Sequence, residues 1–406
     1  MKNRSITTPQ TITGKKVLLV LGIIFVAFNL RPAITSVGPL IGLIREDLGI
    51  SNGVAGFITT LPLIAFALLS LLAPGFARRW GSERAVFLGL LILIIGITAR
   101  STGAITGVFL GTALAGIGIA VGNVLLPGIV KQKFPGKVGL MTSVYTTSMS
   151  IFAALASGLS IPLAQRLHWG WKNSLAFWAF FTVLAILIWI PQLRNQNKPA
   201  SIQASQPEAD TGALWRSPLA WQVTLFMGLQ SFLFYCTVAW LPEILQNRGM
   251  NEGEAGWMLS IMQLIGLPVT FLTPVLADRL ANQKGIAVLI GVIQFLGTLG
   301  LFFHSFAILV ASVVMIGISL GGYISLALSL LGLRTRNAIQ AARLSGMAQS
   351  VGYAFAAVGP SLMGFLFDHL HTWIPSLVIW LIITICLIFI GIGAGRDEYV
   401  SFEKKA

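Results

Sequence analysis

The sequence predicts an all-α integral membrane protein, with twelve transmembrane helices in two pseudo-symmetric halves of six. Three observations support this fold class. Charged residues make up only 10% of the 406 residues and hydrophobic residues 55%, whereas about a quarter of the residues in a soluble chain are charged. Apolar stretches of about 20 residues, long enough to cross ~30 Å of hydrocarbon as helices, recur along the whole chain. Matching motifs also recur at an offset of about 200 residues.

A polar segment divides the predicted spans into two groups of six. Residues 194–217 lack apolar periodicity and are rich in Asn, Gln, Pro and Ser, so they are predicted to form a flexible cytoplasmic linker. The linker separates an N-terminal six-helix half, residues 1–193, from a C-terminal six-helix half, residues 218–406. The predicted spans are 17–40, 54–75, 86–102, 105–129, 138–164, 174–193, 218–241, 255–276, 286–303, 306–331, 343–367 and 374–394.

The distribution of Lys and Arg predicts the orientation of the chain. With the N-terminus in the cytoplasm, the predicted cytoplasmic segments hold 21 of the 27 Lys and Arg residues. This bias follows the positive-inside rule and predicts a multi-pass protein of the cell membrane with both termini in the cytoplasm. It also explains the net charge of +14 better than a nucleic-acid partner would. The predicted outer segments hold only Arg45, Arg100, Arg166, Lys172 and Arg248.

The matching motifs predict that one half is a duplicate of the other. Pro74 and Pro274 are expected to end the second and the eighth span, respectively. Two parallel six-helix repeats around a site at the bilayer midplane are the architecture of a secondary transporter. The other matches pair residues 55–57 with 255–257, 77–79 with 277–279, and 117–119 with 316–318.

Residues 74–84, after the second predicted span, resemble the short basic loop between spans two and three of the major facilitator superfamily. The family pattern begins with Gly, has Asp-Arg in its middle and continues with Gly and basic residues. Here Pro74 replaces the first Gly and Arg78 replaces the Asp, whereas the second half keeps the Asp-Arg pair. The resemblance implies the major facilitator fold. It also implies a charge latch between the halves at Arg79, Asp278 and Arg279. Ordinary positive-inside charge is the alternative for Arg79 and Arg84.

A narrower resemblance lies in the first span. The run Asn-Leu-Arg-Pro-Ala-Ile-Thr-Ser-Val-Gly-Pro-Leu at residues 29–40 is similar to the first span of the cyanate permease and 2-nitroimidazole transporter family within that superfamily. Residues 82–84 and 126–131 are also similar to that family. The resemblance implies transport of a small compound. It does not fix which compound, because the substrates named for the family differ in charge and shape.

Arg31 is predicted to be the central residue of the binding site. It lies in an apolar stretch, residues 17–44, and no other clearly mid-span position carries a charge. Arginine stays protonated, and a charge near the bilayer centre costs a few kcal/mol, so such residues usually face a cavity. Pro32 and Pro39 each remove a backbone hydrogen bond and predict a kink that lines this cavity. The alternative is that Arg31 braces neighbouring helices through their carbonyl groups.

Further polar and aromatic residues in the middle of predicted spans are candidates for binding a substrate beside Arg31. The superfamily resemblance implies that spans one, two, four, five, seven, eight, ten and eleven surround the central cavity. Within the first span, Thr35 shares a helix face with Arg31 because the two are four residues apart. Packing between helices is the alternative for every candidate. The candidates are Thr35, Asn123, Tyr145, Gln230, Gln263, Gln349 and Tyr353.

Several absent motifs narrow the range of functions. No predicted mid-span position holds Asp or Glu, which argues against proton coupling through a buried carboxylate. The sequence contains no Walker-type phosphate loop, no HExxH pair and no G-x-S-x-G elbow, so we expect neither an enzyme nor a cofactor or metal site. Cys236 and Cys386 lie in separate predicted spans and indicate no disulfide.

Together these features predict a monomeric secondary carrier that lies in the lipid bilayer and moves a small anionic or electron-rich polar solute by alternating access. One alternative is an exporter of neutral aromatic compounds, in which Tyr145, Trp240 and Tyr353 stack on the substrate and Arg31 only braces helices. A membrane sensor or channel is a further alternative. The duplicated halves argue against a channel, and the lack of a sizeable soluble domain argues against a sensor.

Overall fold

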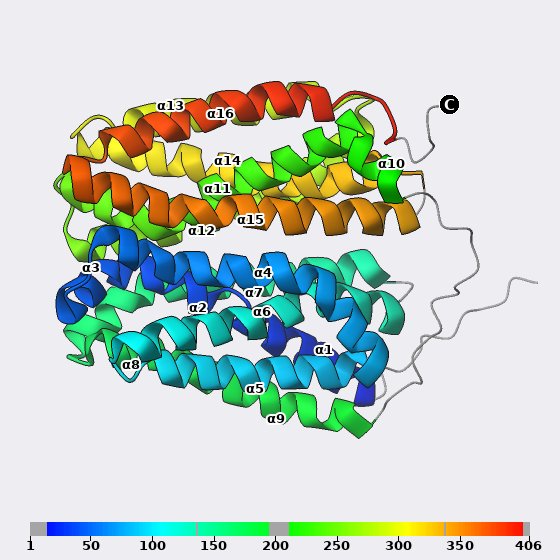
Figure 1. The fold of residues 1–406 in the computed structure, drawn as a ribbon, viewed down its shortest axis with the longest axis horizontal. Coiled ribbons are helices and arrows are strands. Elements are labelled where there is room, and N and C mark those ends of the chain that lie inside the picture. The colour runs from blue at the N-terminus through cyan, green and yellow to red at the C-terminus, as the bar shows by residue number, and fades with distance from the viewer. Residues whose placement is uncertain (1–13, 135–136, 195–210, 337, 401–406) are drawn as a thin grey trace, which may run out of the picture.

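The structure is a computed structural model that describes residues 14–134, 137–194, 211–336 and 338–400. These residues form helices and no strand, which confirms the predicted all-α class. Two groups of long helices lie one above the other, with α1 to α9 below and α10 to α16 above in Figure 1. Residues 14–194 are called the N-terminal half below, and residues 211–400 the C-terminal half.

The N-terminal half begins with a span that is divided among three helices. Its elements are α1 (Gly14–Asn29), α2 (Pro32–Thr35), α3 (Val37–Leu48), α4 (Asn52–Trp80), α5 (Ser82–Arg100), α6 (Ile105–Lys133), α7 (Val138–Ile161), the π-helical turn η2 (Pro162–Arg166), α8 (Gly170–Ala176), α9 (Trp178–Trp189) and the 3-10 turn η3 (Ile190–Arg194).

The C-terminal half begins with a short helix in the predicted linker. Residues 195–210 of that linker lie outside the described residues, and its last part forms a helix although the sequence predicts a flexible segment. The elements are α10 (Thr211–Arg216), α11 (Pro218–Asn247), α12 (Glu252–Arg279), α13 (Lys284–Gly300), α14 (Phe306–Leu333), α15 (Ala338–Leu370) and α16 (Ile374–Ala394).

Eleven helical segments of the described residues are long and apolar enough to cross a membrane. A shorter apolar helix, α13, has 17 residues and rises about 26 Å. Large apolar side chains such as Leu110, Leu289 and Phe389 are exposed. Their exposure would be unfavourable in water and suits contact with lipid tails. The predicted membrane-protein class is therefore confirmed.

Pro74 and Pro274 do not end their helices, contrary to the expectation from the sequence. α4 continues to Trp80 and α12 continues to Arg279. A proline removes one helix hydrogen bond, but its fixed φ suits a helix. The remaining backbone groups keep their helical bonds because the bilayer offers no water to replace them. Both prolines lie within the last two turns of helices that are 29 and 28 residues long.

Three helix pairs form most of the boundary between the halves. α4 packs along α15, α7 along α12, and α3 against α11. Gly56 permits the close approach of the first pair, because a Cβ atom at this position would lie 2.7 Å from the carbonyl carbon of Pro360. Polar contacts between the halves gather where α3 leads into α4, on the left in Figure 1. This end of the molecule is called the α3–α4 end below.

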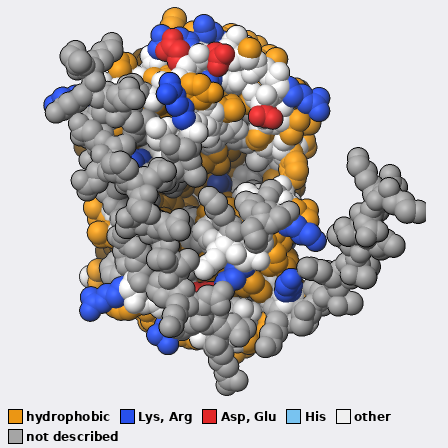
Figure 2. All heavy atoms as spheres, turned by 90° about the vertical axis from the view of Figure 1, so that its right-hand side faces the viewer, with side chains coloured by type: hydrophobic (Ala, Val, Ile, Leu, Met, Phe, Trp, Pro, Cys, Tyr) orange, Lys and Arg blue, Asp and Glu red, His pale blue; other side chains and the backbone are white. Residues whose placement is uncertain are grey.

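The opposite end of the molecule carries the start of α1, the helix α10 and the residues that follow α16 (Figure 1). It is called the terminal end below. Figure 2 looks onto this end and shows Lys and Arg side chains around its edge. The positive-inside rule predicts that an end with such a basic edge faces the cytoplasm.

Single cysteines at the two ends test this orientation. Ser51 is exposed between α3 and α4, and Glu398 is exposed after α16. In a background without Cys236 and Cys386, we expect a membrane-impermeant maleimide to label Ser51→Cys on intact cells. Glu398→Cys should become labelled only after the membrane is permeabilised. Labelling of Glu398→Cys on intact cells would contradict the predicted orientation.

Candidate functional site

The first span is interrupted at Arg31. α1 ends at Asn29, and Arg31 precedes α2 with φ −122° and ψ −38°. Pro32 explains this interruption, because a proline disfavours the helical conformation of the residue before it. A second interruption lies at Ser36, between α2 and α3 and three residues before Pro39. The distortion falls earlier because a proline leaves free the carbonyl group four residues before it.

Hydroxyl groups of α7 bind the carbonyl groups at the second interruption. Pro39 has no N–H for the carbonyl of Thr35, and Ser157 donates its hydroxyl to that carbonyl instead, at 3.1 Å. Ser160 donates to the carbonyl of Ser36 at 3.0 Å. An unsatisfied backbone group is costly inside a bilayer. These two bonds therefore hold the interrupted segment against α7.

Arg100 binds the same segment from α5, in a position that the sequence did not predict. The charge distribution predicts an outer segment for this residue, whereas it is the last residue of α5 and only 1% exposed. Its Nη1 atom donates to the carbonyl oxygen of Ala33 at 2.5 Å. Hydropathy does not reveal this burial, because a long side chain at a span end can reach toward water or back into the protein.

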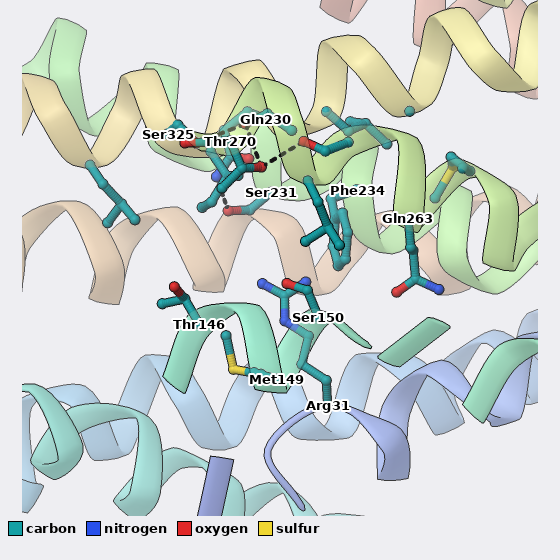
Figure 3. A pocket seen from close by; sticks show the side chains of 18 of the residues that line it. Arg31, Thr146, Met149, Ser150, Gln230, Ser231, Phe234, Gln263, Thr270 and Ser325 are labelled. Carbon is teal, nitrogen blue, oxygen red and sulfur yellow. Dashed lines mark hydrogen bonds between the residues drawn. The ribbon is translucent and has the colours of Figure 1, made fainter. Parts of the chain in front are cut away.

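Arg31 points from the interruption toward the C-terminal half, as Figure 3 shows. Its guanidinium carbon lies 4.9 Å from the centroid of the Phe234 ring on α11. This geometry is a cation–π contact between the two halves. Within the described part of the chain, the guanidinium makes no hydrogen bond or ion pair. Its N–H donors are therefore available to a ligand.

The guanidinium of Arg31 lies in a central cavity with two adjoining lobes. The first lobe extends along α12 and α14, and the second lobe extends toward α4, α6 and α15. Arg31, Phe234, Tyr235 and Tyr353 line both lobes, so the lobes form one site between the halves. All eight candidate binding residues line this site. Arg31 and Tyr353 line both lobes, Gln230 and Gln263 the first, and Thr35, Asn123, Tyr145 and Gln349 the second.

Two of the candidate binding residues also fasten α7. The hydroxyl of Thr35 donates to the carbonyl of Ala153 at 3.0 Å. The side-chain amide of Gln263 donates to the hydroxyl of Ser157 at 2.8 Å and so joins α12 to α7 across the halves. Hydrogen bonds between membrane helices are a common use of such residues. Thr35 and Gln263 therefore help to build the cavity wall.

The other candidate amides differ in how free they are. Gln230 is 2% exposed and donates to the hydroxyl of Ser231 at 2.8 Å. Gln349 donates to Ser345, one turn earlier on α15, also at 2.8 Å. Asn123 on α6 lines the second lobe and is exposed. Of these three amides, that of Asn123 is the most accessible to a ligand.

A cluster of hydroxyl groups in the first lobe was missed by the sequence analysis. Ser231 on α11, Thr270 on α12 and Ser325 on α14 all line this lobe (Figure 3). Ser325 donates to the carbonyl of Thr270 at 3.0 Å, which joins α14 to α12. Ser and Thr are frequent in membrane spans, so no single position is conspicuous. The one available signal is the spacing of Ser231 and Phe234, which are three residues apart on one helix face.

Trp240 does not line the cavity, contrary to the alternative in which it stacks on a neutral aromatic substrate. Its side chain is fully buried, and its ring centroid lies 5.1 Å from that of Trp373. Its indole N–H donates to the carbonyl of Pro360 at 2.8 Å. A buried indole needs such a partner, and here that partner joins α11 to α15.

The residues of the predicted charge latch lie apart at the terminal end. Arg79 is next to the last residue of α4, and Asp278 and Arg279 end α12. All three side chains are exposed. They form no ion pair with one another or with other described residues. A latch between these helices is therefore not formed in this conformation.

Polar contacts close the boundary between the halves at the α3–α4 end. The carboxylate of Asp368 on α15 accepts hydrogen bonds from the backbone N–H groups of Asn52 and Gly53, at 2.9 and 2.7 Å. It therefore caps the N-terminus of α4 from the other half. Arg45 on α3 donates to the Asn52 side chain and lies 3.9 Å from Glu243 on α11. Asn52 and Asp368 are 316 residues apart, so the sequence alone did not reveal this cap.

Comparison with known proteins identifies related chains along almost the whole length. The family model described as Major Facilitator Superfamily matches residues 19–356 and 243–400. An uncharacterized transporter of Bacillus subtilis is 53% identical over 95% of this chain and 96% of its own. A 2-nitroimidazole transporter of Escherichia coli is 40% identical over 97% of this chain and 100% of its own. A cyanate transport protein of the same organism is 24% identical over 86% and 89%.

A solved structure shares the fold. The crystal structure of a nucleoside transporter superposes with a TM-score of 0.76 and covers 93% of this chain and all of its own. Its sequence identity is only 15%, so this likeness concerns the fold alone. The two-half transporter fold and the predicted resemblance in the first span are both confirmed by these comparisons.

Replacing Asp368 tests whether its cap holds the halves together at the α3–α4 end. Ala357 is buried between α4 and α15, so a cysteine there reports opening of this boundary. A helix cap contributes about 1 kcal/mol, and we therefore expect Asp368→Asn to make Ala357→Cys react about fivefold faster with a thiol reagent in purified protein. The native cysteines are removed in both variants.

Glu254→Gln is the matched control, because Glu254 caps α12 within its own half, near the α3–α4 end. It should leave the reaction rate of Ala357→Cys unchanged. An Asp368→Asn protein that reacts no faster than its parent would show that the cap does not hold this boundary closed.

Proposed function

The chain belongs to the Major Facilitator Superfamily, and on this premise we propose that it is a secondary active transporter of a small anionic or electron-rich polar solute that works by alternating access. One observation carries the proposal. Arg31 is the only charged residue among the described residues that line the central cavity. A cation with free hydrogen-bond donors in an otherwise uncharged cavity favours a ligand with negative charge or electron-rich oxygen atoms.

The surroundings of Arg31 favour a small, flat solute. Its guanidinium lies over the Phe234 ring, so the aromatic ring covers one side of the cation and the N–H donors remain for a ligand. A planar edge with several N–H donors matches a carboxylate-like or nitro-like group in two parallel hydrogen bonds. Tyr353 lines the same space and lies 5.4 Å from Phe66 between ring centroids, which adds an aromatic wall.

The names of two relatives agree with this chemistry. Cyanate is a small anion, and 2-nitroimidazole carries a nitro group, with two electron-rich oxygen atoms, on a flat ring. Both molecules present oxygen or nitrogen acceptors to a cation. We therefore choose cyanate and 2-nitroimidazole as probes for this chain, because one tests the anionic class and the other tests the neutral electron-rich class.

Alternating access requires that the two halves close the cavity at one end at a time. Contacts at the α3–α4 end, such as the Asp368 cap, support an inward-facing state in which the terminal end is the open side. Residues 1–193 and 218–406 would rock as two bodies about the site. When the terminal end closes, the end of α4 would approach the C-terminal half and the end of α12 would approach the N-terminal half. Arg79 on α4, and Asp278 and Arg279 on α12, could then form ion pairs that hold this end closed.

Substitution of Arg31 tests the proposed role directly. A hydrogen bond to a charged group contributes about 1.5–3 kcal/mol, so Arg31→Gln should weaken binding of cyanate about 10- to 100-fold. Arg31→Lys keeps the charge but loses the planar arrangement of N–H donors, so its loss of cyanate affinity should be smaller than that of Arg31→Gln. For 2-nitroimidazole, Arg31→Gln removes hydrogen bonds to a ligand without net charge, so the loss should be smaller than for cyanate, about tenfold or less. Binding is measured by calorimetry on purified protein.

Arg166→Gln is the matched control, because Arg166 is exposed at the end of η2 and lines neither lobe. The amount of each variant in the membrane is measured as well, since an arginine that only braces helices would lower that amount. An Arg31→Gln protein that accumulates normally and binds both probes as tightly as the wild type would refute the proposed site.

A further inference from the structure

Arg100 is a buried cation that has no acidic partner among the described residues. Its one side-chain hydrogen bond among the described residues goes from Nη1 to the carbonyl oxygen of Ala33. Its Nε and Nη2 atoms are buried and have no hydrogen-bond partner in the described part of the chain. The ion pairs between described residues do not include it. Ala33 is two residues from Arg31, so this single bond reaches the interruption that carries the cavity's cation.

A charged residue is not needed merely to satisfy the carbonyl of Ala33. Ser157 and Ser160 satisfy the neighbouring carbonyls of Thr35 and Ser36 with neutral hydroxyl groups. Burying a guanidinium costs several kcal/mol, because the group stays protonated and loses its water. A charged donor forms a stronger bond to a carbonyl than a hydroxyl does. The hydrogen bond from Arg100 to the carbonyl of Ala33 therefore fixes the backbone beside Arg31 more strongly than a serine hydroxyl would.

Arg100 stands on a rigid support. A Cβ atom on Gly111 of α6 would lie 2.9 Å from the Cα atom of Arg100, and one on Gly96 would lie 2.9 Å from the Cα atom of Ala115. The backbones of α5 and α6 are thus in direct contact at Arg100 and one turn before it. Close-packed backbones have little freedom to slide, so the Cα atom of Arg100 is held in place, and the hydrogen bond to Ala33 fixes the far end of its side chain.

We propose that Arg100 is a positioning residue for substrate binding: it fixes the interruption between α1 and α2 so that Arg31 is held out into the cavity. Arg100 itself lines neither lobe and does not touch the substrate. It acts through the carbonyl of Ala33 and the two-residue connection to Arg31. The inference rests on the proposed role of Arg31 in binding.

A double-mutant cycle separates positioning from general stability. Residues that act through one another show non-additive effects. We expect Arg100→Met to weaken binding of cyanate and 2-nitroimidazole about tenfold in the wild-type background, and less than about twofold when Arg31→Lys is already present. If Arg100→Met does not accumulate in the membrane, Arg100→Lys is used in the same double-mutant cycle, and its expected loss of affinity for the two probes is smaller.

Arg334→Met is the matched control. Arg334 is 2% exposed and donates from Nε to the carbonyl of Ala394 at 2.9 Å, so it is also a buried arginine that braces backbone, but in the C-terminal half. Its replacement should lower thermal stability without changing the affinity for either probe. A loss of affinity equal to that of Arg100→Met would show that any buried arginine has this effect, and would overturn the inference.

A second readout does not depend on the substrate. In a background without the native cysteines, the thiol introduced by Arg31→Cys is labelled with a small neutral reagent, and Ser150→Cys on α7 serves as a reference in the same cavity. Arg100→Met should slow labelling of Arg31→Cys at least about threefold and leave Ser150→Cys unchanged, because only the interruption moves.

These two readouts distinguish the possible failures. If the wild-type protein binds neither probe while the labelling rates change as expected, the proposed substrate class is wrong and the positioning role stands. If Arg100→Met weakens binding equally in both Arg31 backgrounds, or if the labelling of Arg31→Cys is unchanged, Arg100 does not position Arg31.

Discussion

The structure depends on how the protein interrupts a membrane helix without leaving its backbone polar groups unsatisfied. A bilayer offers no water to the free carbonyl groups near Pro32 and Pro39, so other side chains must bind them. Arg100, Ser157 and Ser160 do so from α5 and α7. The interruption places Arg31 at the boundary between the halves, where its charge faces a cavity. The carbonyl groups of the interrupted helix need hydrogen-bond donors, and this need links the packing of the N-terminal half to the chemistry of the site.

The same principle governs the boundary between the halves. At the α3–α4 end, the carboxylate of Asp368 satisfies backbone N–H groups at the start of α4. Once the two halves separate at this end, water can take the place of the carboxylate at the start of α4, so such a cap can form and break. Within the interior of the boundary, Gly56 lets α4 and α15 approach through their backbones. Polar contacts that can break at the α3–α4 end, beside a close-packed interface between α4 and α15, suit two halves that separate at one end, as alternating access requires.

Hydropathy predicted the spans because each apolar stretch must be helical in a bilayer, and proline beside a mid-span arginine predicted the interruption at Arg31. Features that depend on long-range geometry could not be predicted. Arg100 stands at a span end, where its side chain can turn either way, and Asp368 meets a helix that is distant in sequence. Trp240, which only the aromatic-exporter alternative places against a substrate, is buried against Trp373, because hydropathy does not show which face of a span meets its neighbours. The hydroxyl cluster around Thr270 was missed since single Ser and Thr residues carry no distinctive pattern.

Arg31 is proposed to bind the transported solute between the two halves, and a structure of the protein with bound 2-nitroimidazole or cyanate tests this role. We expect the ligand to lie within hydrogen-bond distance of the Arg31 guanidinium, beside Phe234 and in contact with residues of both halves. A ligand bound elsewhere, with the guanidinium of Arg31 bonded only to backbone carbonyl groups of neighbouring helices, would contradict it.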